Sequence, residues 1–84
     1  MQELIIATTT WCKPCKILKS RLEQEDLLSN VVIKDSFVDF EFFKERNIKS
    51  VPQLLIIENG IVIESVYGEE SIVERIVAEY HSDI

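Results

Sequence analysis

Apolar residues form four short runs along the 84-residue chain, at residues 4–7, 31–33, 54–57 and 61–63. Short apolar runs bounded by polar segments are typical of β-strands that other elements cover. The last two runs are joined across Asn59-Gly60, and both positions of a type I′ turn need the positive φ that these residues tolerate. The pattern therefore predicts four strands, of which the last two form an antiparallel hairpin.

Three further segments repeat apolar residues at helical spacing. They are residues 13–28, 39–46 and 69–80. In the first, Cys15, Leu18 and Leu22 share one face, and Asp39 is the predicted N-cap of the second. The third begins with Glu69 and Glu70, whose charges suit the positive end of a helix. Its predicted inward positions are Ile72, Val73, Ile76, Val77 and Tyr80.

Four phenylalanines lie in or just before the second predicted helix: Phe37, Phe40, Phe42 and Phe43. Their spacing accounts for burial, with Phe40 and Phe43 facing inward, so we expect the cluster to be core. An aromatic binding platform is the less favoured alternative.

The order of elements is β-α-β-α-β-β-α. A strand, helix and strand within some thirty residues predict a right-handed parallel βαβ unit. The expected fold is a minimal α/β domain over residues 1–84, with a four-stranded mixed sheet and helices on both faces.

Composition narrows the class of protein. The chain is 46% hydrophobic and 29% charged, with a net charge of −6, which argues against general nucleic-acid binding. No apolar segment approaches the roughly 20 residues that span a bilayer, and the N-terminus lacks a signal-peptide pattern. We therefore expect a cytoplasmic protein without membrane contact.

The two cysteines, Cys12 and Cys15, are the strongest chemical signal. A bridge between residues three apart closes too little chain to act as a structural staple. Tetrahedral zinc needs four ligands, whereas the chain offers two cysteines and the distant His81, which we expect to be solvated. Redox chemistry is the remaining interpretation, and no metal is expected.

The segment Trp11-Cys12-Lys13-Pro14-Cys15 falls where the first strand leads into the first helix. A helix N-terminus favours the thiolate that thiol exchange requires, and Lys13 adds positive charge nearby. Pro14 is tolerated in the first turn and stiffens the loop. Three-residue spacing lets Cys15 reach Cys12. Trp11 is expected to shield the sulfur and contact a partner, with core packing as the weaker alternative.

This W-C-K-P-C run resembles the W-C-x-P-C active-site pattern of the thioredoxin family. Val51-Pro52 is similar to the family's cis-proline loop, and Tyr67-Gly68 resembles the pair that precedes its last helix. The resemblance covers essentially the whole chain.

The resemblance implies a thiol–disulfide oxidoreductase with no bound cofactor. Cys12 is then the nucleophile and Cys15 the resolving thiol, and Pro52 is cis and faces the disulfide. The backbone of Val51 pairs with an extended substrate segment, while Trp11, Tyr67 and Gly68 complete the substrate surface. The implied partners are disulfides in other proteins, with ribonucleotide reductase as one client by analogy, and an NADPH-dependent thioredoxin reductase. A monomer is expected.

The sequence departs from full-length thioredoxins in two respects. Ile6 occupies the position of a buried acidic residue that helps move the proton of the resolving thiol. Asp35 and Lys34 are the nearest substitutes by topology, although solvating a strand end accounts for them equally well. The chain also starts at the first core strand, so in length it is closer to glutaredoxins and to short thioredoxin-like proteins of archaea and phages.

A glutaredoxin that uses glutathione is the main alternative. Ser50-Val51-Pro52 partly resembles the glutaredoxin Thr-Val-Pro segment, and Glu69 and Glu70 are candidates for the glutathione amine. An iron–sulfur cluster shared across a dimer, which Pro14 disfavours, and a redox-inactive interaction domain are the remaining alternatives.

Overall fold

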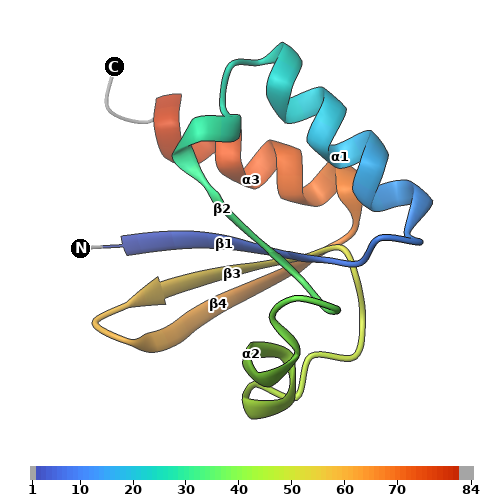
Figure 1. The fold of residues 1–84 in the computed structure, drawn as a ribbon. Coiled ribbons are helices and arrows are strands. Elements are labelled where there is room, and N and C mark those ends of the chain that lie inside the picture. Colours follow the sequence, from blue (N-terminus) through green and yellow to red (C-terminus); the bar gives the residue numbers. More distant parts are fainter. Residues whose placement is uncertain (1, 82–84) are drawn as a thin grey trace.

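The computed structural model describes residues 2–81, apart from the side chains of Tyr80 and His81, so the predictions for those two side chains lie outside the description. The elements are β1 (Gln2–Thr8), α1 (Lys13–Gln24), the 3-10 turn η1 (Leu28–Asn30), β2 (Val32–Asp35), α2 (Phe40–Glu45), β3 (Gln53–Glu58), β4 (Ile61–Tyr67) and α3 (Glu69–His81) (Figure 1). The strand order in the sheet is β2-β1-β3-β4. The predicted order of elements and the mixed four-stranded sheet are confirmed.

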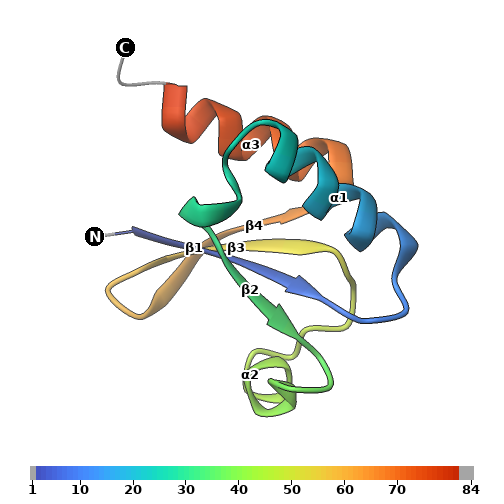
Figure 2. The ribbon, with the colours of Figure 1, turned by 45° about the horizontal axis from the view of Figure 1, so that its top comes forward.

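The sheet has a parallel half and an antiparallel half. β1 pairs in parallel with β2, with Ile5 opposite Val32, and pairs antiparallel with β3. β3 and β4 form the predicted hairpin, in which Asn59 and Gly60 both have positive φ. α1 and α3 lie on one face of the sheet and α2 lies on the other, as Figure 2 shows from a second direction.

The larger part of the core lies beneath α1 and α3. Because side chains alternate along a strand, Leu4, Ile6, Leu54 and Ile56 all reach this face. They pack against the apolar faces of the two helices, whose buried residues include Leu18, Leu22, Ile72, Val73 and Ile76. The opposite face is thinner. There Ile5, Leu55 and Ile57 pack against Phe42 and Ile48 of the short α2 region.

The first helix is four residues shorter than predicted. It ends at Gln24, and Asp26 takes the left-handed conformation with φ of 58°. Leu27 N donates to Leu22 O, and Asp26 N donates to Glu23 O. These two bonds form a Schellman turn, which redirects the chain and buries Leu27 in the core.

The phenylalanine cluster is only partly core, so that prediction is wrong for Phe37 and Phe40. Phe43 is buried and Phe42 is half-buried, whereas Phe37 and Phe40 are exposed. The reason is the length of α2: a helix of six residues has room for one inward stripe, and Phe37 precedes it in a loop.

Asp39 occupies the predicted N-cap position of α2, but its carboxylate does not cap that helix. It accepts instead from Asp35 N, at 3.1 Å, and lies 3.9 Å from Lys34 Nζ.

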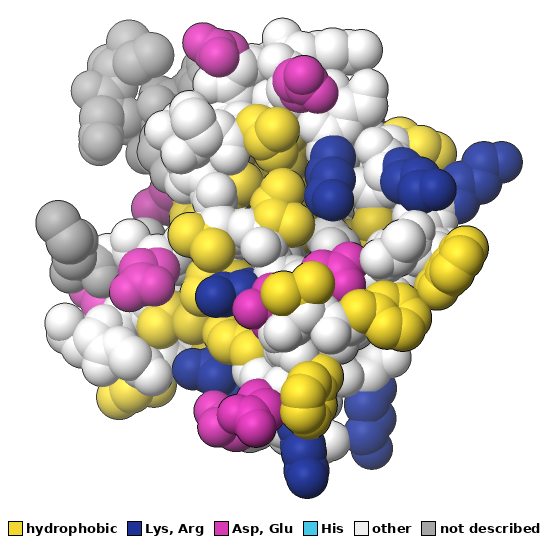
Figure 3. Space-filling view, in the orientation of Figure 1, with side chains coloured by type: hydrophobic (Ala, Val, Ile, Leu, Met, Phe, Trp, Pro, Cys, Tyr) yellow, Lys and Arg dark blue, Asp and Glu magenta, His cyan; other side chains and the backbone are white. Residues whose placement is uncertain are grey.

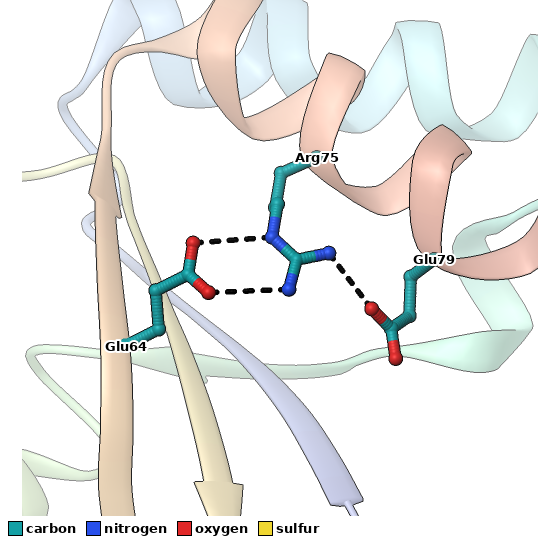
Figure 4. Close-up of polar contacts among 3 residues, drawn as sticks. All are labelled: Glu64, Arg75 and Glu79. Carbon is teal, nitrogen blue, oxygen red and sulfur yellow. Dashed lines mark hydrogen bonds and ion pairs between the residues drawn. The ribbon is translucent and has the colours of Figure 1, made fainter. Parts of the chain in front are cut away.

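An arginine on α3 ties that helix to β4 (Figure 4). Arg75 donates to both carboxylate oxygens of Glu64, each at 3.1 Å, and to Glu79 at 2.7 Å. Hydrogen bonding from Arg75 holds the pKa of Glu64 below its usual value, and hydrogen bonding to Glu64 and then to Glu79 raises the pKa of Arg75.

We expect Glu64→Gln to lower stability slightly at neutral pH. Because the pKa of Glu64 is lower in the folded chain, its stabilising effect is present above the ordinary value of 4.5 and disappears as the pH falls through the folded value. Thermal unfolding from pH 7 to pH 3 measures this difference. Glu74→Gln removes the same charge from an exposed site on α3 and is the control. A difference between Glu64→Gln and the parent chain that does not shrink as the pH falls contradicts the ion pair.

None of the helices within residues 2–81 is long and apolar enough to cross a lipid bilayer.

Candidate active site

The cysteine segment lies in the loop from β1 into α1, at one end of the sheet (Figure 1). Cys12 is the N-cap residue of α1 and has an extended backbone conformation. Its N–H donates to Thr9 O at 3.2 Å, and its carbonyl accepts from Lys16 N at 3.3 Å. The start of the helix and the tight loop before it thus fix the position of Cys12.

Cys12 and Cys15 form a disulfide, with their Cα atoms 5.2 Å apart. Cys15 is buried, with 1% of its surface exposed, whereas Cys12 is partly exposed. This difference suits the two roles that dithiol exchange requires. A substrate disulfide can reach Cys12, and the sulfur of Cys15 lies beneath it.

The surroundings of Cys12 Sγ favour a thiolate. Cys15 N–H donates to this sulfur at 3.2 Å, so the sulfur takes the place of the oxygen of an ordinary N-cap side chain. The unpaired N–H groups and positive end of α1 add to this effect. Lys13 is the first residue of α1 and is exposed, and Pro14 lies in its first turn as predicted.

The register of the sheet places three loop segments side by side at this end. Ala7 lies opposite Gln53, and Gln53 lies opposite Tyr67. The segment that follows β1, the Val51–Pro52 segment that precedes β3 and the Tyr67-Gly68 segment that ends β4 therefore emerge next to one another. Three of the sequence motifs are thus brought to one end of the molecule.

The Val51–Pro52 peptide bond is cis, which confirms that part of the resemblance. Pro52 is buried and Val51 is half-buried. Gly68 has φ of 90°, in the region that favours glycine, and Tyr67 is exposed.

A second loop, between β2 and α2, borders the cysteine loop on its other side. Ser36 N donates to Thr8 O at 3.0 Å, and the Ser36 hydroxyl donates to the Thr9 hydroxyl at 2.9 Å. Asp35 accepts from the Thr10 hydroxyl and, at 2.8 Å, from Phe37 N. These bonds join the two loops.

Large apolar side chains are exposed on both of these loops. Trp11 is 81% exposed, Phe37 64% and Val38 80%. Core packing of Trp11, the alternative weighed from the sequence, is therefore wrong. In Figure 3, apolar side chains project at the edge of the molecule where the cysteine loop lies, with lysines and arginines above and below them, and further apolar side chains are spread over the rest of this face. The exposure of Phe37 and Val38 does not follow from the sequence, because an apolar pair beside three further phenylalanines carries the same signal as core.

Ile6, at the position where the resemblance implies a buried acid, lies in the core with no exposed surface. Asp35 bonds to the two loops described above, and Lys34 faces Asp39 and the ring of Phe42. Within residues 2–81, the hydrogen bonds and ion pairs of these two side chains do not reach either sulfur. Both side chains therefore have polar partners at the end of β2.

The three residues that resemble glutaredoxin positions differ in whether their side chains are available to glutathione. Ser50 is exposed directly before Val51, whereas Glu69 pairs with Arg21 at 3.0 Å. Glu70 is exposed. The ion pair with Arg21 therefore occupies Glu69, one of the two carboxylates predicted as candidates for binding the glutathione amine.

No protein-family model matches the sequence. Among solved structures, the chain is similar to thioredoxin f from spinach chloroplast, with a TM-score of 0.70 and 25% identity over 94% of this chain and 76% of that one. It is similar to oxidised thioredoxin from Plasmodium falciparum, with a TM-score of 0.74 and 21% identity over 94% and 80% of the two chains. Mitochondrial thioredoxin 3 from Saccharomyces cerevisiae gives a TM-score of 0.72 and 21% identity over 99% and 78%.

A partly exposed cysteine at a helix N-cap, bonded to a buried cysteine on this fold, defines a thiol–disulfide oxidoreductase. The chain has the fold of the thioredoxins to which it is similar, and it carries the Cys12–Cys15 pair on that fold.

Proposed function

We propose that this protein reduces disulfides in other proteins by dithiol exchange, in the manner of a thioredoxin. The supporting observation is the environment of Cys12: a partly exposed sulfur at a helix N-cap, 3.2 Å from Cys15 N, in a loop that carries exposed Trp11 and is hydrogen-bonded to the loop that carries exposed Phe37 and Val38. Exposed apolar side chains on the two joined loops suit contact with a protein surface better than contact with a small hydrophilic thiol.

The first step is attack by the Cys12 thiolate on one sulfur of the substrate disulfide. The substrate S–S bond breaks, a mixed disulfide forms, and the leaving thiolate takes a proton from solvent. Cys15 then loses its proton and attacks Cys12 Sγ, which breaks the mixed disulfide and releases the second substrate thiol. Two electrons and two protons pass to the substrate, and the Cys12–Cys15 disulfide remains.

The proposed substrate surface consists of the three adjoining segments. Trp11 contacts the partner beside the sulfur, and Val51 offers its backbone to an extended substrate segment, as the edge of a sheet does. Pro52, Tyr67 and Gly68 line the same end of the sheet. Lys13 and Pro14 adjust the reactivity and rigidity of the loop. The proposed setting is a cytoplasmic monomer recharged by an NADPH-dependent thioredoxin reductase, with ribonucleotide reductase among the clients.

A glutaredoxin is the second candidate, and exposed Ser50 before the cis proline favours it. In that case glutathione recharges the protein, and Cys12 alone suffices to reduce glutathione mixed disulfides. The pairing of Glu69 with Arg21 weighs against it.

The source of electrons separates these candidates. NADPH oxidation is followed with thioredoxin reductase in one cuvette, and with glutathione and glutathione reductase in another, using insulin as the protein disulfide. We expect rapid oxidation with thioredoxin reductase and little with glutathione. Rapid oxidation with glutathione alone overturns the thioredoxin proposal and makes Ser50, Glu69 and Glu70 the residues to test.

A further inference from the structure

A hollow of about 400 Å³ lies on the α2 face of the sheet, separate from the cysteine loop. Its cationic wall is formed by Arg46 and Lys49, at the end of α2 and in the loop that follows. Ser50, Ser65 and Tyr67 supply hydroxyl groups, and buried Leu55 lies at its base. We name this set of six residues the cationic pocket.

The charge of the pocket is opposite to that of the chain. The protein carries 15 acidic residues against 9 basic ones, yet no carboxylate belongs to the pocket lining within the described residues. Two cations and three hydroxyl donors around an apolar base match a ligand with one anionic group on an apolar stem. A glutamate or aspartate side chain has this chemistry.

The cationic wall is held in place. The Arg46 guanidinium lies 4.2 Å from the centre of the Phe42 ring, which limits its movement. After Arg46 the chain turns through Asn47, with φ of 53°, and Ile48 N donates to Phe43 O at 2.9 Å. This second Schellman turn places Ile48 against the core and fixes the start of the segment that carries Lys49.

Two features of the pocket leave its donors accessible. The Tyr67 hydroxyl accepts from Gln53 Nε2 at 3.4 Å, so its own hydrogen is free to point toward a ligand. Arg46 also lies 3.6 Å from Glu45, whose side chain is exposed. A surface pair of this kind is weak, and the planar guanidinium has further N–H groups for a second carboxylate.

The pocket adjoins the proposed substrate segment. Ser50 comes directly before Val51 and Gln53 directly after Pro52, and Tyr67 lies opposite Gln53 in the sheet. An extended substrate that pairs with Val51 sends successive side chains to opposite sides. Residues near the substrate cysteine that point toward the α2 face therefore approach the cationic pocket.

We propose that the cationic pocket receives an acidic side chain of the substrate, a few residues from its reactive cysteine. This inference rests on the proposed reduction of protein disulfides. The pocket then selects acidic segments, which the net charge of the protein otherwise repels, and it distinguishes clients that share the same disulfide chemistry.

A peptide series tests this selectivity. Each peptide carries one cysteine in a mixed disulfide with thionitrobenzoate, and glutamate occupies one of the three positions on either side, with a glutamine peptide as its counterpart. We expect one glutamate position to react with the reduced protein about 3- to 10-fold faster than its counterpart at low salt. Added salt lowers this ratio, because it screens partly exposed charges.

Variants of the pocket and a matched control decide the outcome. The double variant Arg46→Gln/Lys49→Gln should bring the ratio close to one. The double variant Lys19→Gln/Lys44→Gln removes the same number of positive charges from exposed sites outside the pocket, so it should keep the ratio. A ratio that is equal in all three proteins, or that is near one at every position, overturns the inference.

A binding measurement keeps this test separate from the redox proposal. Peptides with serine in place of cysteine are added to the oxidised protein, and the amide signals of Ser50, Leu55 and Ser65 are followed by NMR. Shifts with the glutamate peptide alone support the pocket even if no disulfide is reduced. If the thionitrobenzoate peptides react but neither serine peptide shifts these signals, the pocket inference fails and the redox proposal stands.

Discussion

Replacing Cys12 with serine should abolish the reduction of protein disulfides, with a loss of roughly 10³-fold or more, as expected when the nucleophile of a coupled set is removed. A hydroxyl at this position is neither ionised near neutral pH nor able to form the mixed disulfide. The measurement is the initial rate of insulin reduction with dithiothreitol as electron donor. Retention of more than a few per cent of the rate contradicts the assignment of Cys12 as nucleophile.

The companion variant Cys15→Ser separates the two sulfurs. Attack by Cys12 still occurs in this variant, but no buried thiol resolves the mixed disulfide, so the covalent complex with the substrate should accumulate. Non-reducing gel electrophoresis of the variant with insulin measures it, and Cys12→Ser is the matched control that forms no complex. Covalent complexes in Cys12→Ser but not in Cys15→Ser reverse the assignment. Serine at the buried position costs little volume, and thermal unfolding of each reduced variant checks the fold.

Replacing Ile56 with alanine should lower the free energy of unfolding by about 2–5 kcal/mol. Ile56 has no exposed surface and lies in the middle of β3, between the sheet neighbours β1 and β4 and beneath α1 and α3. Removing three carbons there leaves a cavity that the packed helices fill only in part. Urea unfolding of the oxidised protein measures the effect.

Ile63→Ala is the matched control, since it removes the same atoms from the neighbouring strand. Ile63 is 51% exposed, so its replacement should change stability by about 0.5 kcal/mol or less. Equal losses in the two variants contradict the description of the core, in which the α1 and α3 face of the sheet supplies most of the buried contacts.

The local sequence pattern predicts the strands and the two long helices correctly. Each of these elements is buried either on one face or on both faces, and each kind of burial leaves a regular pattern of apolar residues. The run at residues 54–57 lies in a central strand covered on both faces, so it is apolar throughout. Asn59-Gly60 specifies the hairpin because the turn needs left-handed backbone at both positions. These features depend on residues close together in sequence, and the structure confirms them.

The predictions from the sequence are wrong where tertiary contacts determine the end of a helix or the burial of a side chain. The first helix stops at Gln24 because burial of Leu27 and a Schellman turn at Asp26 outweigh the helical preference of the residues that follow. Phe37 and Phe40 are exposed because the six-residue α2 has one inward stripe, which Phe43 occupies, and Phe37 lies in the loop before it. Periodicity reports which side chains are apolar, and it does not report whether a neighbouring element is present to bury them.

In the candidate active site, too, some residues follow from a local motif and others are brought together only by the fold. The positions of Cys12, Pro14 and Cys15 follow from one local motif at a helix start, whereas the exposed pair Phe37 and Val38 joins it only through the pairing of β1 with β2. The cationic pocket is still less visible in the sequence. Lys49 and Ser65 lie on separate segments, and only the sheet register brings them together.

Mixing the reduced protein with one equivalent of a protein disulfide, quenching in acid and alkylating the free thiols tests the proposed exchange most directly. Mass spectrometry of the peptide that contains both cysteines then follows the Cys12–Cys15 pair. We predict that each substrate disulfide reduced produces one intramolecular Cys12–Cys15 disulfide, with the loss of two hydrogen atoms from that peptide. Reduction of the substrate while Cys12 and Cys15 both remain alkylated contradicts dithiol exchange through this pair.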